Sequence, residues 1–285
     1  MPARGLPRRL RSGAAFAAAG LLLLVAGVLA RAFGADAAWM LGVHATAPTA
    51  FSVIAWSCLT VAGLGWSVLI LMLATDRRTG LLASLVLPTF VLGGLLTHVP
   101  KHFLAEPRPA ATSIAPHLHV IGRAFTGAVS MPSGHALAAG ATAVLLCSVL
   151  ARGLLARMLI VLVAVLIAVS RVVVGAHWPS DVLVGFGLGL LSGGMVVAAA
   201  AALRSGDWHA GLAARLRSRA GQRVLALVEL GAAAGLLREN TGYPAGTPMV
   251  WLLVALAVAS AVLRVRATLQ PAGPALVQDT PAGQS

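Results

Sequence analysis

Three short segments hold most of the side chains in this sequence that could carry out chemistry. They are residues 101–109, 131–135 and 170–181, and each borders a long apolar stretch. The first segment brings together Arg108 and Lys101, which is the only lysine among 21 basic residues. A compact ammonium, used where every other cation is an arginine, indicates a specific contact. For this segment taken alone, the alternative is that Lys101 only flanks a transmembrane helix and extends its charge to the membrane interface.

The second segment predicts the start of a helix. Ser133 follows a proline and precedes an apolar run, which is typical of an N-cap residue. Gly134 allows close approach of another group to the backbone, and His135 falls in the first helical turn. Because the N-terminus of a helix exposes unpaired amides, this segment favours an anion. A capped helix without a ligand would explain Ser133 equally well, but it leaves His135 unexplained.

The third segment predicts a histidine held by a carboxylate. Pro179 suits the first position of a helix, so Asp181 falls in the first turn and can reach back to the ring of His177. An imidazole held in this way has a fixed tautomer and a stabilised cation. A surface histidine beside a helix-capping aspartate is the alternative for this pair in isolation.

Together the segments predict a site for phosphoryl transfer. Such a reaction needs several donors around the phosphate oxygens, an in-line nucleophile and an acid for the leaving oxygen. Two histidines in unlike environments can divide the last two roles. We expect no metal and no cofactor, because carboxylates are scarce and the spacing from His98 to His102 contains Pro100, which disfavours a continuous helical turn.

The composition indicates the elements that must position these segments. Of the 285 residues, 59% are hydrophobic and only 10% are charged, which excludes a soluble globular protein because too few polar residues remain to cover the surface. The net charge of +13 does not indicate a nucleic-acid partner, since the arginines form short clusters between apolar runs. The expected surroundings are a lipid bilayer.

The apolar runs predict an all-α polytopic membrane helical bundle with six core transmembrane helices. These spans are expected at about residues 14–32, 53–74, 81–98, 136–150, 158–174 and 182–203. We predict four parts: a six-helix membrane core at 1–203, a cytoplasmic basic interfacial segment at 204–223, a C-terminal transmembrane or re-entrant hairpin at 224–266, and a disordered tail at 267–285.

The basic residues predict the orientation. With the N-terminus in the cytoplasm, thirteen of them fall at the cytoplasmic ends of the six core spans and five at the opposite ends, as the positive-inside rule requires. The three chemical segments then face the periplasm of a bacterial inner membrane.

The spacing within the three segments resembles a known signature. Six residues separate Lys101 from Arg108-Pro109, and residues 132–135 read Pro-Ser-Gly-His. Five residues separate Ser170-Arg171 from His177, and three separate His177 from Asp181. This pattern is similar to the three-part motif of the type 2 phosphatidic acid phosphatase superfamily. The region from 101 to 181 carries the resemblance, which implies the six-helix membrane branch of that family.

The resemblance implies a role for each motif residue. His177 would be the nucleophile that forms a phosphohistidine, Asp181 would orient it, and His135 would protonate the leaving group. The phosphate oxygens would be held by Lys101, Arg108, Ser133, Gly134 and Arg171. Neighbouring polar residues are assigned no catalytic role: His98, His102, Glu106, His117 and His119.

The sequence therefore predicts a membrane lipid phosphatase acting on a phosphate monoester or diphosphate. Phosphatidic acid, phosphatidylglycerol phosphate, undecaprenyl diphosphate and a lipid A phosphate all present a terminal phosphoryl group. Transfer of phosphate between two lipids is a variant on the same site. A transporter or flippase is less favoured because Glu229 is the only acid clearly inside an apolar run, and an inactive scaffold is less favoured because all three motifs are complete.

Overall fold

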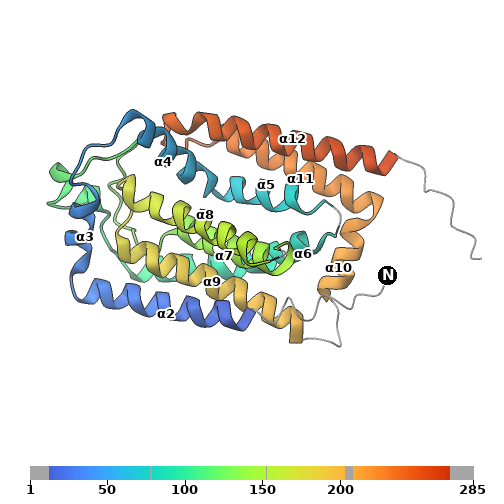
Figure 1. The fold of residues 1–285 in the computed structure, drawn as a ribbon, viewed down its shortest axis with the longest axis horizontal. Helices are drawn as coiled ribbons and strands as arrows, with labels where there is room; N and C mark the ends of the chain where they lie inside the picture. The colour runs from blue at the N-terminus through green and yellow to red at the C-terminus, as the bar shows by residue number, and fades with distance from the viewer. Residues whose placement is uncertain (1–12, 78, 152, 203–207, 270–285) are drawn as a thin grey trace, which may run out of the picture.

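The computed structural model describes residues 13–77, 79–151, 153–202 and 208–269, and within these ranges every regular element is a helix (Figure 1). The α-helices are α2 Gly13–Ala32, α3 Ala35–Val43, α4 Ala50–Ala62, α5 Gly65–Thr75, α6 Leu81–Phe103, α7 Gly134–Val149, α8 Leu154–Val173, α9 Pro179–Ala202, α10 Trp208–Arg217, α11 Arg219–Arg238 and α12 Thr247–Leu269. Short 3-10 helices lie in the connections at η1 Pro109–Ala111, η2 Ala115–His117 and η3 Pro244–Gly246.

The predicted all-α polytopic bundle is confirmed. Among the described helices, six are long and apolar enough to cross a membrane, and the bent pair α4 and α5 makes a seventh if it counts as one span. The chain is therefore a multi-pass membrane protein. Helix α7 has only 16 residues, which at 1.5 Å per residue is about 24 Å, shorter than a full span.

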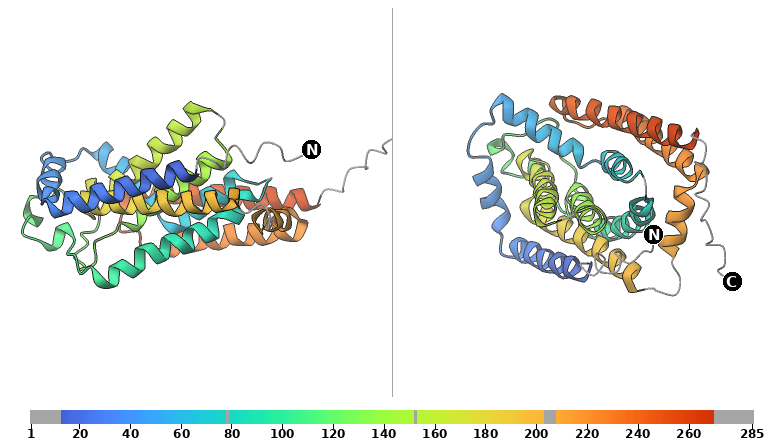
Figure 2. Two further views of the ribbon diagram at one scale, coloured as in Figure 1. Left: turned by 90° about the horizontal axis from the view of Figure 1, so that it is seen from below. Right: turned by 45° about the vertical axis from the view of Figure 1, so that its right-hand side comes forward.

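Helix α9 lies at the centre of the core, between α2 and α7 (Figures 1 and 2). Glycines let these backbones approach closely. A Cβ added to Gly187 would lie 2.6 Å from the carbonyl oxygen of Gly20, and one added to Gly189 would lie 2.2 Å from that of Leu137. Close backbone contact of this kind is how membrane helices gain van der Waals packing where lipid removes the hydrophobic drive. The packing fixes α9 against α2 and against the first turn of α7.

The second predicted span, 53–74, is not one continuous helix. It breaks into α4 and α5, which meet at an angle of 73°. The chain is extended at Leu64 between two glycines, and glycine lowers helix propensity. A Cβ added to Gly63 would lie 2.7 Å from Ile167 and 3.3 Å from the ring of His135. The break therefore lets the end of α4 approach α7 and α8 closely.

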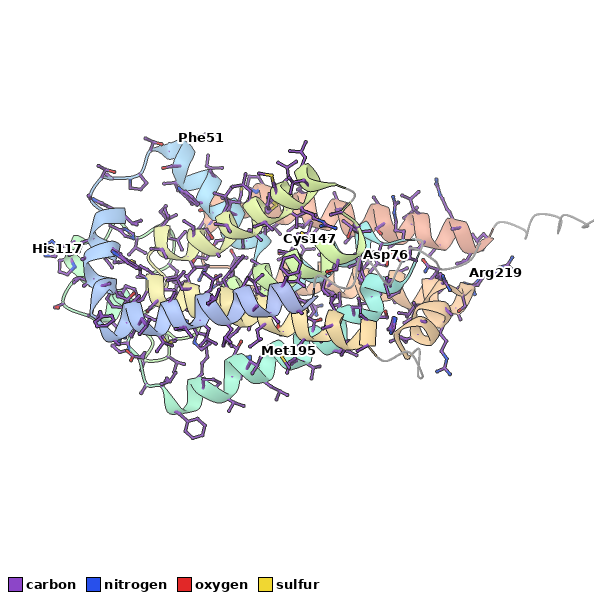
Figure 3. All side chains as sticks on the ribbon, turned by 60° about the horizontal axis from the view of Figure 1, so that its bottom comes forward. Phe51, Asp76, His117, Cys147, Met195 and Arg219 are labelled. Atoms are coloured by element: carbon purple, nitrogen blue, oxygen red, sulfur yellow. The ribbon has the colours of Figure 1, made fainter. Side chains whose placement is uncertain are left out.

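The bundle has two distinct ends. One end holds the C-termini of α6, α8 and α11, the N-termini of α7, α9 and α12, and the long connection at residues 104–133 (Figure 1). The other end holds the α5–α6 and α7–α8 connections together with α10. Figure 3 shows His117 at the first end and Asp76 with Arg219 toward the second. All three chemical segments lie at the first end.

The C-terminal hairpin, predicted at 224–266 as transmembrane or re-entrant, consists of α11 and α12 and extends past both predicted bounds. Helices α11 and α12 both reach spanning length and pack on each other and on α5. The polar residues within the hairpin are paired inside the bundle. Arg264 donates to Glu229 at 3.2 Å and to Gln222 at 2.8 Å. Internal pairing of this kind offsets the cost of burying charge in a membrane.

The predicted interfacial segment, 204–223, includes α10 and the first turn of α11. Its residues 204–207 lie outside the described part of the chain, as do residues 270–285 of the predicted tail. Residues 267–269 continue α12.

Candidate active site

The fold brings the three segments to one place through the ends of four helices and two connections. Each predicted site residue lies on one of them: Lys101 on the last turn of α6, Arg108 in the connection that follows, Ser133 at the N-cap of α7, Gly134 and His135 in its first turn, Arg171 near the end of α8, His177 in the α8–α9 turn, and Asp181 in the first turn of α9.

His177 lies between a carboxylate and a guanidinium. Its Nδ1 lies 3.3 Å from Oδ2 of Asp181, and its Nε2 lies 3.3 Å from Nη1 of Arg108. Because an arginine can only donate and a carboxylate can only accept, these partners assign the proton to Nδ1 and the lone pair to Nε2. The ring is thus oriented with its nucleophilic nitrogen toward the cationic side of the site.

Two donors hold the Asp181 carboxylate, which explains how this buried group keeps its orientation. The Ser130 hydroxyl and the backbone amide of Trp178, at 3.0 Å, donate to Oδ2. The backbone amide of Ser133 donates to the Asp181 carbonyl at 3.0 Å and ties the start of α7 to that of α9. Ser130 was not singled out from the sequence, where only its place one residue before the second segment marks it.

The environment of His177 favours the neutral imidazole. Burial lowers its pKa well below the ordinary value, and the charges of Arg171, Arg108 and Lys101 lower it further. A neutral ring at neutral pH has the lone pair that a nucleophile needs. Burial followed by the charge of Arg171 also lowers the pKa of Arg108.

Two buried nitrogens at this site have no hydrogen-bond partner in the described part of the chain. They are Nε2 of His135 and Nε of Arg171. The charges of Arg171, Arg108 and Lys101 act on the ring of His135, as does His177, so these groups face one site. Because a buried donor without a partner costs free energy, the two nitrogens fit an anionic ligand.

The N-terminus of α7 forms another wall of the site. The Ser133 side chain accepts a hydrogen bond from the amide of Ala136 at 3.4 Å, which confirms the predicted N-cap. The amides of Gly134 and His135 have no acceptor within the helix. A Cβ added to Gly134 would meet nothing within 4 Å, so open space lies beside this backbone.

Polar contacts of Asp36 and Arg31 hold the start of α9 and join it to the first segment. Asp36 on α3 accepts from the backbone amide of Ser180 at 2.9 Å and from its hydroxyl. Arg31 pairs with Asp36 and with Glu106, and its guanidinium carbon lies 5.9 Å from the centre of the Trp178 ring. Asp36 and Arg31 were not identified from the sequence, because no sequence spacing relates Asp36 to Ser180, 144 residues away.

Comparison with known proteins shows which chains have similar sequences. A family model described as the PAP2 superfamily matches residues 79–204, which include all three segments. This part of the chain is therefore similar to the PAP2 superfamily. The chain is also 33% identical over 126 residues to an undecaprenyl-diphosphatase of Sulfolobus acidocaldarius, a match that covers 44% of this chain and 58% of that relative. No solved structure matches significantly.

All eight predicted site residues lie within the PAP2 segment, and the resemblance stated from the three motifs is confirmed at family level. Two further residues of the site lie outside it: Thr60 on α4 and Tyr243 on the α11–α12 connection both contact Arg171. Among the described residues, no group of three or more His, Cys, Asp and Glu side chains could hold a metal ion.

Proposed function

We propose that this PAP2 protein is an integral membrane phosphatase that removes a terminal phosphate from a lipid monoester or diphosphate at the periplasmic face. The observation that carries the proposal is the contrast between the surroundings of two histidines. His177 has its Nδ1 against Asp181 and its Nε2 toward Arg108, while Nε2 of His135 is buried and without a partner in the described chain. The first arrangement suits a nucleophile, and the second suits an acid that meets its partner only in the substrate.

In the first step, Nε2 of His177 attacks phosphorus as the bond to the leaving oxygen breaks. His135, protonated at Nε2, gives its proton to that oxygen, and the product is a phosphohistidine. Asp181 keeps the Nδ1 proton of His177 in place and stabilises the charge that develops on the ring. Without substrate, Nη1 of Arg108 contacts Nε2 of His177. When substrate binds, Arg108 would donate to a phosphate oxygen instead.

In the second step, water attacks phosphorus of the phosphohistidine. His135, now neutral, takes a proton from the water, the N–P bond breaks, and phosphate leaves with His177 restored. Charge on the phosphoryl oxygens is met by Lys101, Arg108, Arg171 and the amides at the start of α7. The proposed reaction therefore places protein cations where other phosphatases use metal ions.

The substrate class follows from the surroundings and from the relative. The site lies at one end of a membrane bundle, where helix ends and connections meet, so the head group of a bilayer lipid can reach it. The relative from Sulfolobus acidocaldarius is described as an undecaprenyl-diphosphatase, which favours a polyisoprenyl diphosphate over the other lipid phosphates for this chain.

Phosphate release by the purified protein tests this function. We expect release from undecaprenyl diphosphate and, more slowly, from phosphatidic acid or phosphatidylglycerol phosphate, with full activity in EDTA. Orthovanadate should inhibit in the same buffer, because its trigonal bipyramidal form imitates the phosphoryl group in transfer. A requirement for added Mg²⁺ or Zn²⁺, or no inhibition by millimolar vanadate, would contradict the metal-free histidine mechanism.

The proposed orientation can be checked by labelling cysteines with an impermeant thiol reagent in intact cells. Single cysteines would be placed at Ser113 and Ala220, which are exposed at opposite ends of the bundle, after Cys58 and Cys147 are replaced by alanine. We expect labelling at 113 and protection at 220 until the cells are opened, because the basic residues cluster at the second end. Protection at 113 with labelling at 220 would place the site in the cytoplasm.

A further inference from the structure

The guanidinium of Arg171 is anchored at one corner by residues from outside the PAP2 segment. Its Nη1 donates to the hydroxyl oxygen of Thr60 at 2.5 Å and to that of Tyr243 at 2.9 Å. The Arg171 guanidinium carbon also lies 5.5 Å from the centre of the Tyr243 ring. Both partners are buried, and Tyr243 is the only tyrosine in the chain.

Tyr243 is held in place by contacts between the α11–α12 connection and the loop that carries Arg108. The amide of Arg123 donates to the carbonyl of Gly242 at 2.8 Å. A Cβ added to Gly122 would lie 2.4 Å from that same oxygen, and φ is +75° at both glycines. The ring of Phe125 lies 6.3 Å from that of Tyr243. The backbone around Tyr243 is thus fixed against the active-site loop.

The anchoring determines which edge of the guanidinium remains for a ligand. With Nη1 occupied, the edge formed by Nε and Nη2 is the one that can contact two oxygens of an anion at once. Nε is buried and has no partner in the described chain. The contacts at Nη1 therefore orient the guanidinium so that Nε and Nη2 are left to bind an anion.

We propose that Tyr243 is a positioning residue for Arg171 and that the C-terminal hairpin completes the active site. The inference rests on the proposed function, in which Arg171 binds the transferred phosphoryl group. The tyrosine acts through the arginine: its hydroxyl oxygen accepts from Nη1 and keeps the guanidinium from rotating. This gives the α11–α12 hairpin a role in catalysis beyond its packing in the membrane.

The test removes only the hydroxyl, with Tyr243→Phe, and keeps the ring that packs on Phe125. We expect kcat/KM for phosphate release to fall about ten- to a hundredfold, the range for losing a hydrogen bond to a charged group, and vanadate binding to weaken by a similar factor. Vanadate binding to the full-length protein is measured by calorimetry, which does not depend on turnover. Thr247→Val is the matched control, because it removes a hydroxyl from the same end of the hairpin that contacts only the Pro244 carbonyl.

A double variant separates positioning from the alternatives. Arg171→Lys alone is expected to lower activity and vanadate binding, because lysine keeps the charge but loses the planar fork. In that background Tyr243→Phe should have less than a twofold further effect, while the thermal unfolding midpoint stays that of the parent. The tyrosine has nothing left to orient once the guanidinium is gone.

Each other outcome contradicts the proposal in a recognisable way. If Tyr243→Phe weakens vanadate binding equally in both backgrounds, the tyrosine contacts the anion directly. If it lowers the unfolding midpoint and Thr247→Val does the same, its role is structural. If the wild type binds vanadate but releases no phosphate from any lipid, the proposed function fails while the effect of Tyr243 on anion binding can still be measured.

Discussion

Replacing His177 with alanine is expected to lower phosphate release by roughly 10⁴-fold or more, the scale on which loss of a nucleophile acts. Its Nε2 is the nitrogen with a lone pair facing the cations, and no other side chain occupies that position between Asp181 and Arg108. Steady-state phosphate release measures the loss. Rapid acid-free quenching with radiolabelled substrate should also show an acid-labile phosphoenzyme in the wild type and none in the variant.

The control for this variant is His117→Ala, a histidine exposed on η2 at the same end of the bundle. It should retain wild-type activity. Because His177 is 97% buried in a tight turn, being only 3% exposed, His177→Gln is added to fill the space with a polar side chain, and unfolding midpoints are compared. Activity within tenfold of the wild type in a folded His177 variant would exclude this residue as the nucleophile.

Replacing His135 with alanine is expected to produce a loss that depends on the leaving group. For phosphatidic acid the departing alkoxide needs a proton, and removal of a general acid costs about 10²- to 10⁴-fold. For a p-nitrophenyl phosphate the departing phenolate is stable without one, so the loss should be much smaller. The ratio of kcat/KM for the two substrates, in wild type and variant, isolates proton donation from other roles.

His98→Ala provides the matched comparison, since His98 is exposed on α6 near the same end. It should leave both substrates unaffected. An equal loss on both substrates in His135→Ala would mean that the ring holds the phosphate or the fold and does not donate a proton. A loss of kcat/KM for the aryl phosphate alone would contradict the role of His135 as general acid.

The local parts of the site follow from sequence because short-range geometry determines them. Pro179 begins α9, which puts Asp181 one turn from His177, and the observed contact of 3.3 Å is the one that this spacing predicts. Ser133 caps α7 for the same reason. Each contact joins residues at most four apart, where a proline or a capping hydroxyl largely fixes the backbone between them.

Four predicted core spans, 14–32, 81–98, 158–174 and 182–203, correspond to single helices of spanning length, whereas 53–74 is bent and α7 is short. For the C-terminal hairpin the sequence left a transmembrane and a re-entrant arrangement open. Its buried polar residues have partners within the fold: Arg264 donates to Glu229 and to Gln222. A hydropathy average along the sequence includes the free-energy cost of burying each polar side chain. It does not include the interaction with a partner elsewhere in the fold that offsets this cost.

The orientation of Arg171 was decided by tertiary structure alone. The sequence marks it as a cation of the third segment, but its partners Thr60 and Tyr243 lie 111 and 72 residues away. Thr60 reaches it because the second span breaks at Gly63, and Tyr243 reaches it because two glycines join the hairpin to the active-site loop. Such contacts depend on which helix surfaces pack together, and no periodicity or spacing along a single chain encodes that choice.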